Sequence, residues 1–222
     1  MWNAVIANHA SRITHHGSRI TDHGSRITNQ NHESRTTHRI PKLMERAPND
    51  KSLPELARLT VEKFVLDGET LEPPLEIGGQ LAERAGVFVT LRTSDGQLRG
   101  CIGTIEPARA TVAEEVIQNA ISAATRDPRF PPVARHELEG MKYGVDVLAK
   151  PEPARGPEDL DPARYGVIVE TLDRNRRGLL LPRIEGIETV EEQWRAVHLK
   201  AGITPGTPVR IERFTVTRFG KD

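Results

Sequence analysis

Cysteine, aromatic residues and long apolar runs are all scarce in this chain of 222 residues. Cys101 is its only cysteine, so the chain alone cannot form an internal disulfide, a zinc ribbon or a three-cysteine iron–sulfur site. Aromatic residues make up only 4% of the chain. No apolar run approaches the roughly 20 residues that a membrane helix needs, and the N-terminus lacks the apolar core of a secretory signal. We therefore expect a protein of the reducing cytoplasm, where pairing of the thiol with another molecule stays open.

Net charge is also absent, because 31 Lys and Arg residues balance 31 Asp and Glu residues. No overall field attracts nucleic acid or an anionic membrane, so we expect neither as a partner. Phosphate-binding loops, dinucleotide fingerprints, zinc-protease motifs and hydrolase nucleophile elbows are missing as well. Nucleotide hydrolysis and zinc proteolysis are not expected, and the sequence predicts no cofactor and no metal site. With 36% hydrophobic residues, the chain can still bury one good core.

A seven-residue repeat occupies the N-terminal part of the chain. Residues 11–17 read Ser-Arg-Ile-Thr-His-His-Gly, and residues 18–24 read Ser-Arg-Ile-Thr-Asp-His-Gly. One isoleucine per copy cannot build a coiled-coil seam or a solenoid face, so we predict a disordered tail over residues 1–43. The rest of the chain, residues 44–222, has the composition of a folded domain.

Six of the eight histidines lie in this tail, and two explanations compete for it. The six are His9, His15, His16, His23, His32 and His38. A histidine-rich tract can bind metal, although dispersed ligands on an unfolded chain have no preformed geometry. We favour the hypothesis that the repeats are translated repetitive DNA upstream of a true start at Met44.

The folded part mixes helices and strands without the regular alternation of a Rossmann pattern. Apolar spacing predicts a helix from Ser52 to Gly68, with Pro54 in its first turn, and a second helix over 111–126. Asp95-Gly96 lies between two strand-like runs, 87–92 and 97–102, and predicts an antiparallel hairpin. Farther on, the pattern predicts a strand over 143–148, a proline-rich loop over 151–162, a hairpin of 166–172 with 178–181, a helix over 189–202 and a final strand over 209–216. The fold class is therefore α+β, a mostly antiparallel sheet flanked by helices.

Several of these segments resemble the AMMECR domain family, also called AmmeMemoRadiSam system protein A. They are Val87-Phe88-Val89-Thr90-Leu91, Leu98-Arg99-Gly100-Cys101-Ile102-Gly103, residues 120–132, and Gly178-Leu179-Leu180-Leu181-Pro182. The resemblance spans roughly residues 50–220, and the segments 191–194 and 200–203 are similar to the compact bacterial branch. It implies two subdomains with a cleft between them and a connection to a Memo-type protein and a radical SAM enzyme. It implies no particular reaction.

Cys101 is the leading candidate for a catalytic residue, because glycines flank it and an arginine lies two places upstream. Alternation along a strand places Arg99 and Cys101 on one face, where the guanidinium could favour a thiolate. The alternative is a small apolar side chain packed in a sheet. A catalytic thiol also needs a base, and outside the tail only His136 and His198 exist.

Four more residues are candidates for ligand binding. Gly100 and Gly103 either admit a ligand close to the backbone or let a helix pack on the sheet. Asp127 and Arg129 follow the second helix on a stiff proline elbow, and with Arg99 and Arg126 they could form a pocket for a carboxylate or phosphate. The alternative is an internal salt bridge between Asp127 and a neighbouring arginine.

Two functions of different class remain at the level of sequence. The first is a binding or accessory module that works with a Memo-type protein and a radical SAM enzyme, which we favour because the recognisable catalytic set is incomplete. The second is a cysteine-dependent enzyme that uses Cys101 in the inter-subdomain cleft on a small or peptidyl substrate. A basic cluster at Arg174, Arg176 and Arg177 is interpreted as a solvated turn, since no aromatic side chains accompany it.

Overall fold

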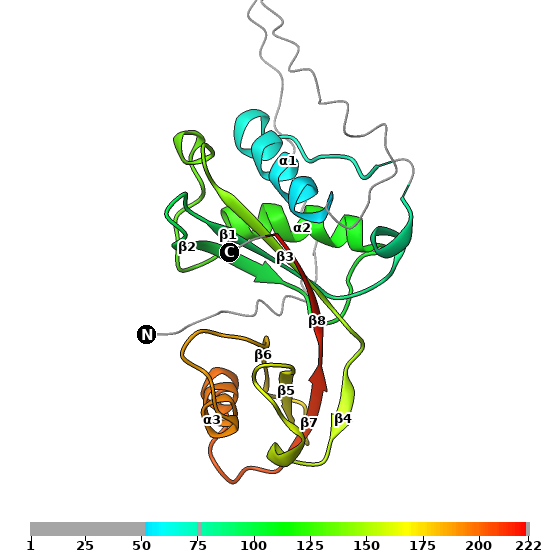
Figure 1. Ribbon diagram of the computed structural model, residues 1–222, viewed down its shortest axis with the longest axis vertical. Helices are drawn as coiled ribbons and strands as arrows, with labels where there is room; N and C mark the ends of the chain where they lie inside the picture. Colours follow the sequence, from blue (N-terminus) through cyan, green and yellow to red (C-terminus); the bar gives the residue numbers. More distant parts are fainter. Residues whose placement is uncertain (1–51, 75–76, 221–222) are drawn as a thin grey trace, which may run out of the picture. The chain divides into compact units, whose positions relative to one another are not determined.

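The computed structural model describes residues 52–74 and 77–220, which form three α-helices and two four-stranded antiparallel sheets (Figure 1). The α+β class predicted from sequence is confirmed. The predicted tail and the proposed start at Met44 lie outside the described residues.

Sheet A carries the motif around Cys101. Its strands are β1 (Val87–Arg92), β2 (Leu98–Gly103), β3 (Lys142–Leu148) and β8 (Val216–Phe219), in the order β2-β1-β3-β8. Helices α1 (Ser52–Asp67) and α2 (Val112–Thr125) pack on one face of it (Figure 1). Val87, Val89 and Leu91 alternate toward these helices and are completely buried.

Sheet B lies later in the chain and is covered by one helix. Its strands are β4 (Glu152–Ala154), β5 (Gly166–Thr171), β6 (Arg177–Leu180) and β7 (Val209–Phe214), in the order β4-β7-β5-β6. Helix α3 (Val190–Ala201) packs on β5 and β6, where Val167, Val169 and Val197 are fully buried. Three short 3-10 helices, η2 (Gly79–Ala82), η3 (Arg135–Glu137) and η4 (Pro157–Asp159), lie in the connections.

The helix ends follow the signals in the sequence. Thr111 accepts a hydrogen bond from the Glu114 N–H, and the Glu114 carboxylate accepts from the Thr111 N–H in return, which is a complete capping box. Thr189 caps α3 in the same way, and Gly202 ends that helix in the left-handed conformation, with φ +65°. The predicted boundaries of all three helices are confirmed to within one or two residues.

Two predicted segments differ from the structure. The run 209–216 is not one strand: β7 ends at Phe214 in sheet B, and β8 begins at Val216 in sheet A. Apolar and polar residues alternate through both β7 and β8, so the change from sheet B to sheet A cannot be recognised in the sequence. The predicted loop over 151–162 contains β4, whose Pro153 is tolerated because β4 is an edge strand.

Residues 152–214 are thus inserted between two neighbouring strands of sheet A. The chain leaves β3 after Leu148 and returns to pair with β3 through β8. At the crossing, the Ala149 N–H donates to the Thr215 carbonyl at 2.9 Å. Apolar side chains of both sheets meet in one cluster, in which Phe88 and Leu148 come from sheet A and the rest from sheet B: Ile168, Leu179 and Phe214.

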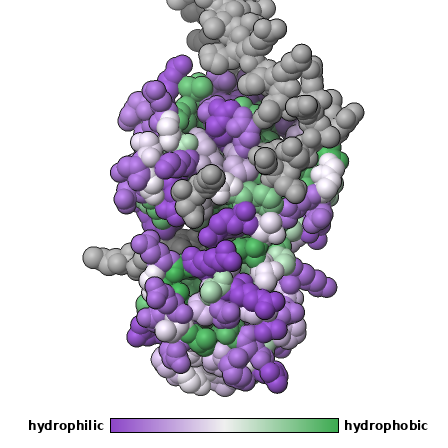
Figure 2. Space-filling view, viewed as in Figure 1, coloured by the Kyte–Doolittle hydropathy of each residue, from purple (hydrophilic) through white to green (hydrophobic). Residues whose placement is uncertain are grey.

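The surface is mixed in character. Figure 2 shows hydrophobic residues in small groups among hydrophilic ones on the visible face. Among the described residues, the large hydrophobic side chains that are exposed are Leu172 and Leu199. No helix in that part of the chain is long and apolar enough to cross a membrane.

Candidate functional site

Cys101 lies on β2 on the face of sheet A that turns away from α2. It pairs in register with Thr90 on β1, and its Sγ lies 3.3 Å from the Thr90 hydroxyl oxygen. The thiol is free and half-buried, and it packs against the apolar cluster shared by the two sheets. The thiol therefore lies between the Thr90 hydroxyl group and an apolar cluster.

The proline elbow after α2 holds the backbone of Cys101. The Asp127 carboxylate accepts the Cys101 N–H at 2.8 Å. Arg129 binds the same carboxylate with two nitrogens, at 2.9 and 2.6 Å, and its Nη2 also donates to the Cys101 carbonyl at 3.5 Å. This is the internal salt bridge that the sequence offered as an alternative to a pocket. Burial would raise the pKa of Asp127, but the hydrogen bonds from Arg129 and Cys101 outweigh it and lower that pKa.

The surroundings of the thiol favour its protonated form. Burial raises the pKa of Cys101 above its usual value, and the negative charge of Asp146 adds to this effect. The Thr90 hydroxyl, Arg129 and Lys200 act in the opposite direction but do not compensate. Cys101 is therefore predominantly a thiol at neutral pH, which is the less nucleophilic form.

Lys200, near the end of α3, is a site residue that sequence analysis missed. The pKa of its amine is lowered to about 8, mainly by burial and to a smaller extent by the nearby Arg129, while Cys101 acts in the opposite direction. No ion pair or hydrogen bond of this amine occurs among the described residues. Lys200 lies 99 residues after Cys101 in the sequence, and only the packing of α3 brings them near each other. No short motif marks this pairing.

Arg99 is engaged elsewhere. The register between β1 and β2 shifts at this point, and its guanidinium binds Glu137 at 2.6 and 2.9 Å. Hydrogen bonding from Arg99 lowers the pKa of Glu137 to about 2. Phe130 lies close to both Arg99 and Arg129, with its ring centroid 5.8 and 5.4 Å from the guanidinium carbons. The sequence predicted that the Arg99 guanidinium could favour a thiolate at Cys101. The charged groups that shift the pKa of Cys101 are instead Arg129, Asp146 and Lys200.

Close packing accounts for both glycines of the motif. A Cβ on Gly100 would lie 2.3 Å from the Ala123 carbonyl oxygen of α2. A Cβ on Gly103 would lie 2.3 Å from the Phe88 ring. The absence of a side chain thus lets α2 and Phe88 approach β2, as the packing alternative predicts. Binding of a ligand at either glycine stays a prediction.

The two histidines outside the tail do not form a dyad with Cys101. The Nδ1 of His198 lies 2.9 Å from the Trp194 carbonyl oxygen within α3, and His136 is exposed on η3. No hydrogen bond joins either ring to the thiol in the part of the chain that the structure describes. Arg126, which the sequence placed with the pocket residues, is exposed at the end of α2.

A second polar network fixes the chain just beyond the motif. Glu115 is completely buried on α2, and it accepts hydrogen bonds from the Thr104 hydroxyl at 2.9 Å and the Arg109 N–H at 2.6 Å. Asn119, one turn later, donates to the Val87 carbonyl at 3.0 Å. The segment that follows β2 is therefore tied to α2, and Cys101 within β2 is tied to the elbow that follows that helix.

Comparison with known proteins agrees with the resemblance seen in the sequence. The family model AMMECR1 matches residues 54–220. A protein of Thermotoga maritima is 52% identical over 161 residues, which are 72% of this chain and 91% of that protein. A protein of Clostridium acetobutylicum is 45% identical over 169 residues, and there the match covers 74% of this chain but only 35% of the relative. This chain therefore spans about a third of that longer protein.

A solved structure shows the same fold. It is the crystal structure of an uncharacterized protein from Pyrococcus horikoshii, with a TM-score of 0.70 and 34% sequence identity. The superposition covers 78% of this chain and 91% of that one. With the family model matching three quarters of the chain, the protein described here belongs to the AMMECR1 family.

Proposed function

We propose that this protein is a binding or accessory module that works with a Memo-type protein and a radical SAM enzyme. The observation that carries the proposal is the state of Cys101: its backbone is held by Asp127 and Arg129, its pKa is raised, and no histidine of the described residues binds it. A nucleophile, an oriented base and oxyanion donors are the usual minimum for covalent catalysis, and this set is incomplete.

The choice of partners follows from the family resemblance, and one relative is consistent with a role as part of a larger assembly. In the Clostridium acetobutylicum protein the matched segment is about a third of a longer chain, so a domain of this family occurs there joined to further sequence. A domain that is covalently attached to other domains in one organism is a reasonable subunit of a complex in another. Radical SAM chemistry would come from the partner, because this chain lacks the three cysteine ligands of the cluster.

Co-purification from the native host tests this function. Gentle extraction of the tagged full-length chain should retain a Memo-type protein or a radical SAM enzyme, identified by mass spectrometry. The Asp127→Asn variant tests the surface around Cys101. Release of the elbow should weaken retention of the partner if this surface contacts it. Absence of both partners from the wild-type sample would contradict the proposal.

A cysteine-dependent enzyme remains the second candidate, since Lys200 brings an amine of lowered pKa toward the thiol. In that mechanism the neutral amine would take the thiol proton. The thiolate would then attack the carbonyl carbon of an acyl group, forming a thioester while the leaving amine or alcohol takes that proton, or one sulfur of a disulfide, forming a mixed disulfide while the other sulfur leaves as a thiol. Thiol labelling separates the two functions. The module predicts slow labelling of the native protein and complete labelling after denaturation, whereas the enzyme predicts fast native labelling that Lys200→Met slows and the exposed control Lys150→Met does not.

A further inference from the structure

A charged hollow lies on sheet B, separate from Cys101. Its volume is about 550 Å³, and four arginines and three glutamates contribute to its lining: Arg155, Arg174, Arg177, Arg210, Glu106, Glu170 and Glu212. The strand register places three of the lining residues side by side. Glu170 on β5 is the cross-strand neighbour of Arg177 on β6 and of Arg210 on β7. Glu170 therefore lies between two arginines in the register of the sheet.

Arg177 is only partly satisfied in this hollow. One of its terminal nitrogens donates to Glu106 at 2.8 Å, and the other is 3.9 Å from Glu212, beyond hydrogen-bonding distance. Its Nε is buried and has no hydrogen-bond partner. A buried N–H without an acceptor is unfavourable, so the Arg177 side chain is not held in a fully satisfied arrangement.

Arg210 is also loosely held. Its side chain is 53% exposed, and its nearest carboxylate oxygen, on Glu170, is 3.9 Å away. A guanidinium at this distance keeps its donors free for a planar oxyanion, which it can bind through two parallel hydrogen bonds. Arg155, by contrast, is already paired with Asp159 at 2.6 Å.

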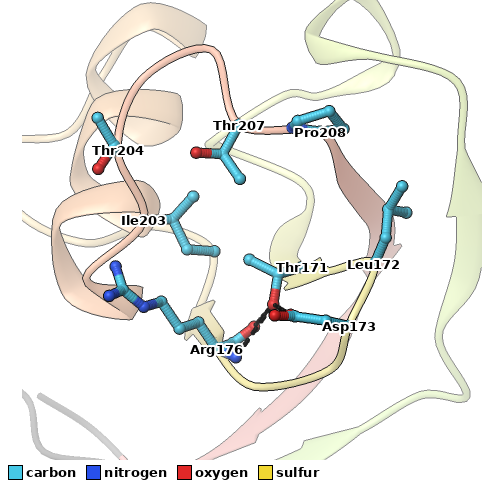
Figure 3. A pocket seen from close by; sticks show the side chains of 8 residues that line it. All are labelled: Thr171, Leu172, Asp173, Arg176, Ile203, Thr204, Thr207 and Pro208. Carbon is cyan, nitrogen blue, oxygen red and sulfur yellow. Dashed lines mark hydrogen bonds between the residues drawn. The ribbon is translucent and has the colours of Figure 1, made fainter.

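The tip of the β5–β6 hairpin adds a third arginine. Asp173 accepts hydrogen bonds from the Asn175 N–H and side-chain amide, which fixes the turn, and Arg174 lines the charged hollow from there. Arg176 lines a different hollow, beside Asp173, Ile203 and Thr207 (Figure 3). The Arg174 backbone N–H donates to the Thr171 carbonyl at 2.8 Å, whereas its guanidinium has no hydrogen bond or ion pair among the described residues. The turn therefore gives the charged hollow a guanidinium without a carboxylate partner in that part of the chain.

We propose that this hollow binds the oxyanion of a small ligand, a carboxylate or a phosphate, between Arg177 and Arg210, with Arg174 at its rim. Such a group would accept hydrogen bonds from the terminal nitrogen of Arg177 that lies 3.9 Å from Glu212 and from the free donors of Arg210. The neighbouring glutamates limit the affinity: Glu170 competes with the ligand for Arg210, and Glu106 and Glu212 compete for Arg177. This inference does not depend on the function of the Cys101 site.

Titration of the full-length protein with inorganic phosphate and with malonate, at constant ionic strength, tests the proposal. Amide NMR signals of β5, β6 and β7 should shift and saturate with at least one of the two anions. Tighter binding of phosphate would assign a phosphoryl ligand, and tighter binding of malonate a carboxylate. Absence of saturable shifts with both anions would overturn the proposal.

Three variants make the test specific. Arg210→Gln should weaken anion binding about fivefold or more, since it removes one of two guanidinium donors. Glu170→Gln should strengthen it about threefold, because the competing carboxylate is gone. Arg195→Gln, at an exposed position on α3 outside the hollow, is the control for net charge and should change little. A gain of affinity with Glu170→Gln cannot come from unfolding, and equal losses in Arg210→Gln and Arg195→Gln would refute the site.

Discussion

Two charged pairs, one beside each sheet, are arranged in opposite ways. On the elbow beside sheet A, Asp127 and Arg129 pair at 2.6 Å with side chains 2% and 22% exposed. On sheet B, Glu170 and Arg210 stand 3.9 Å apart with side chains 25% and 53% exposed. Short buried pairs fix a backbone, whereas long exposed pairs contribute little to stability and leave donors for a ligand. The carboxylate of Asp127 at the Cys101 motif is thus engaged internally, while Arg210 on sheet B keeps donors available.

The largest expected effect tests how tightly sheet A is packed. Gly100→Ala should lower the free energy of unfolding by about 3 kcal/mol or more, because the new methyl group would overlap the Ala123 carbonyl and push α2 from β2. Gly144→Ala is the matched control on β3, where the nearest atom would be 3.9 Å away. Urea denaturation measures both. Equal, small losses in the two variants would show that β2 and α2 are not closely packed.

The next experiment compares one charged pair from each sheet. Asp127→Asn should destabilise the protein by about 2 kcal/mol, because Arg129 loses its buried partner. Glu170→Gln should change stability by about 0.5 kcal/mol or less, since its pairs are long and partly exposed. Thermal and urea unfolding of both variants provide the comparison. A larger loss of stability in Glu170→Gln than in Asp127→Asn would contradict this contrast between the two pairs.

The smallest effect concerns pH. Because the pKa of Glu137 falls from its ordinary value of 4.5 to about 2 on folding, its pairing with Arg99 stabilises the protein fully above pH 4.5. This contribution is lost as the pH decreases toward 2. After solvent screening we expect about 1 kcal/mol, so Glu137→Gln should be less stable than wild type at neutral pH and equally stable near pH 2. A stability difference that stays constant with pH would exclude this origin.

Local signals predicted most of the fold. The capping boxes at Thr111 and Thr189, the Asp95-Gly96 turn and the glycine stops each act within a few residues, so the helices and hairpins could be read directly. The division of 209–216 between two sheets could not, because a strand's partner is chosen by distant residues.

The site was predictable only in part, for the same reason. The sequence identified Cys101, Asp127 and Arg129, and it offered the Asp127 salt bridge as an alternative. It gave no sign of Thr90, Glu137 or Lys200, whose importance comes from contacts made across the folded chain. The proposed cleft between subdomains and ligand binding at Arg99 remain predictions.

The return of the chain from sheet B to β8 has a consequence for synthesis on the ribosome. Strand β3 pairs with β1 on one side as soon as both are made, but its other edge waits for β8, about 70 residues later and at the very end of the described chain. Until β8 emerges, the seven-residue β3 is the open edge of the nascent sheet A, whereas in the folded sheet the four-residue β8 takes that place. A ribosome that stops before β8 would therefore release a product whose exposed edge is a longer strand, which is the better template for pairing with other chains.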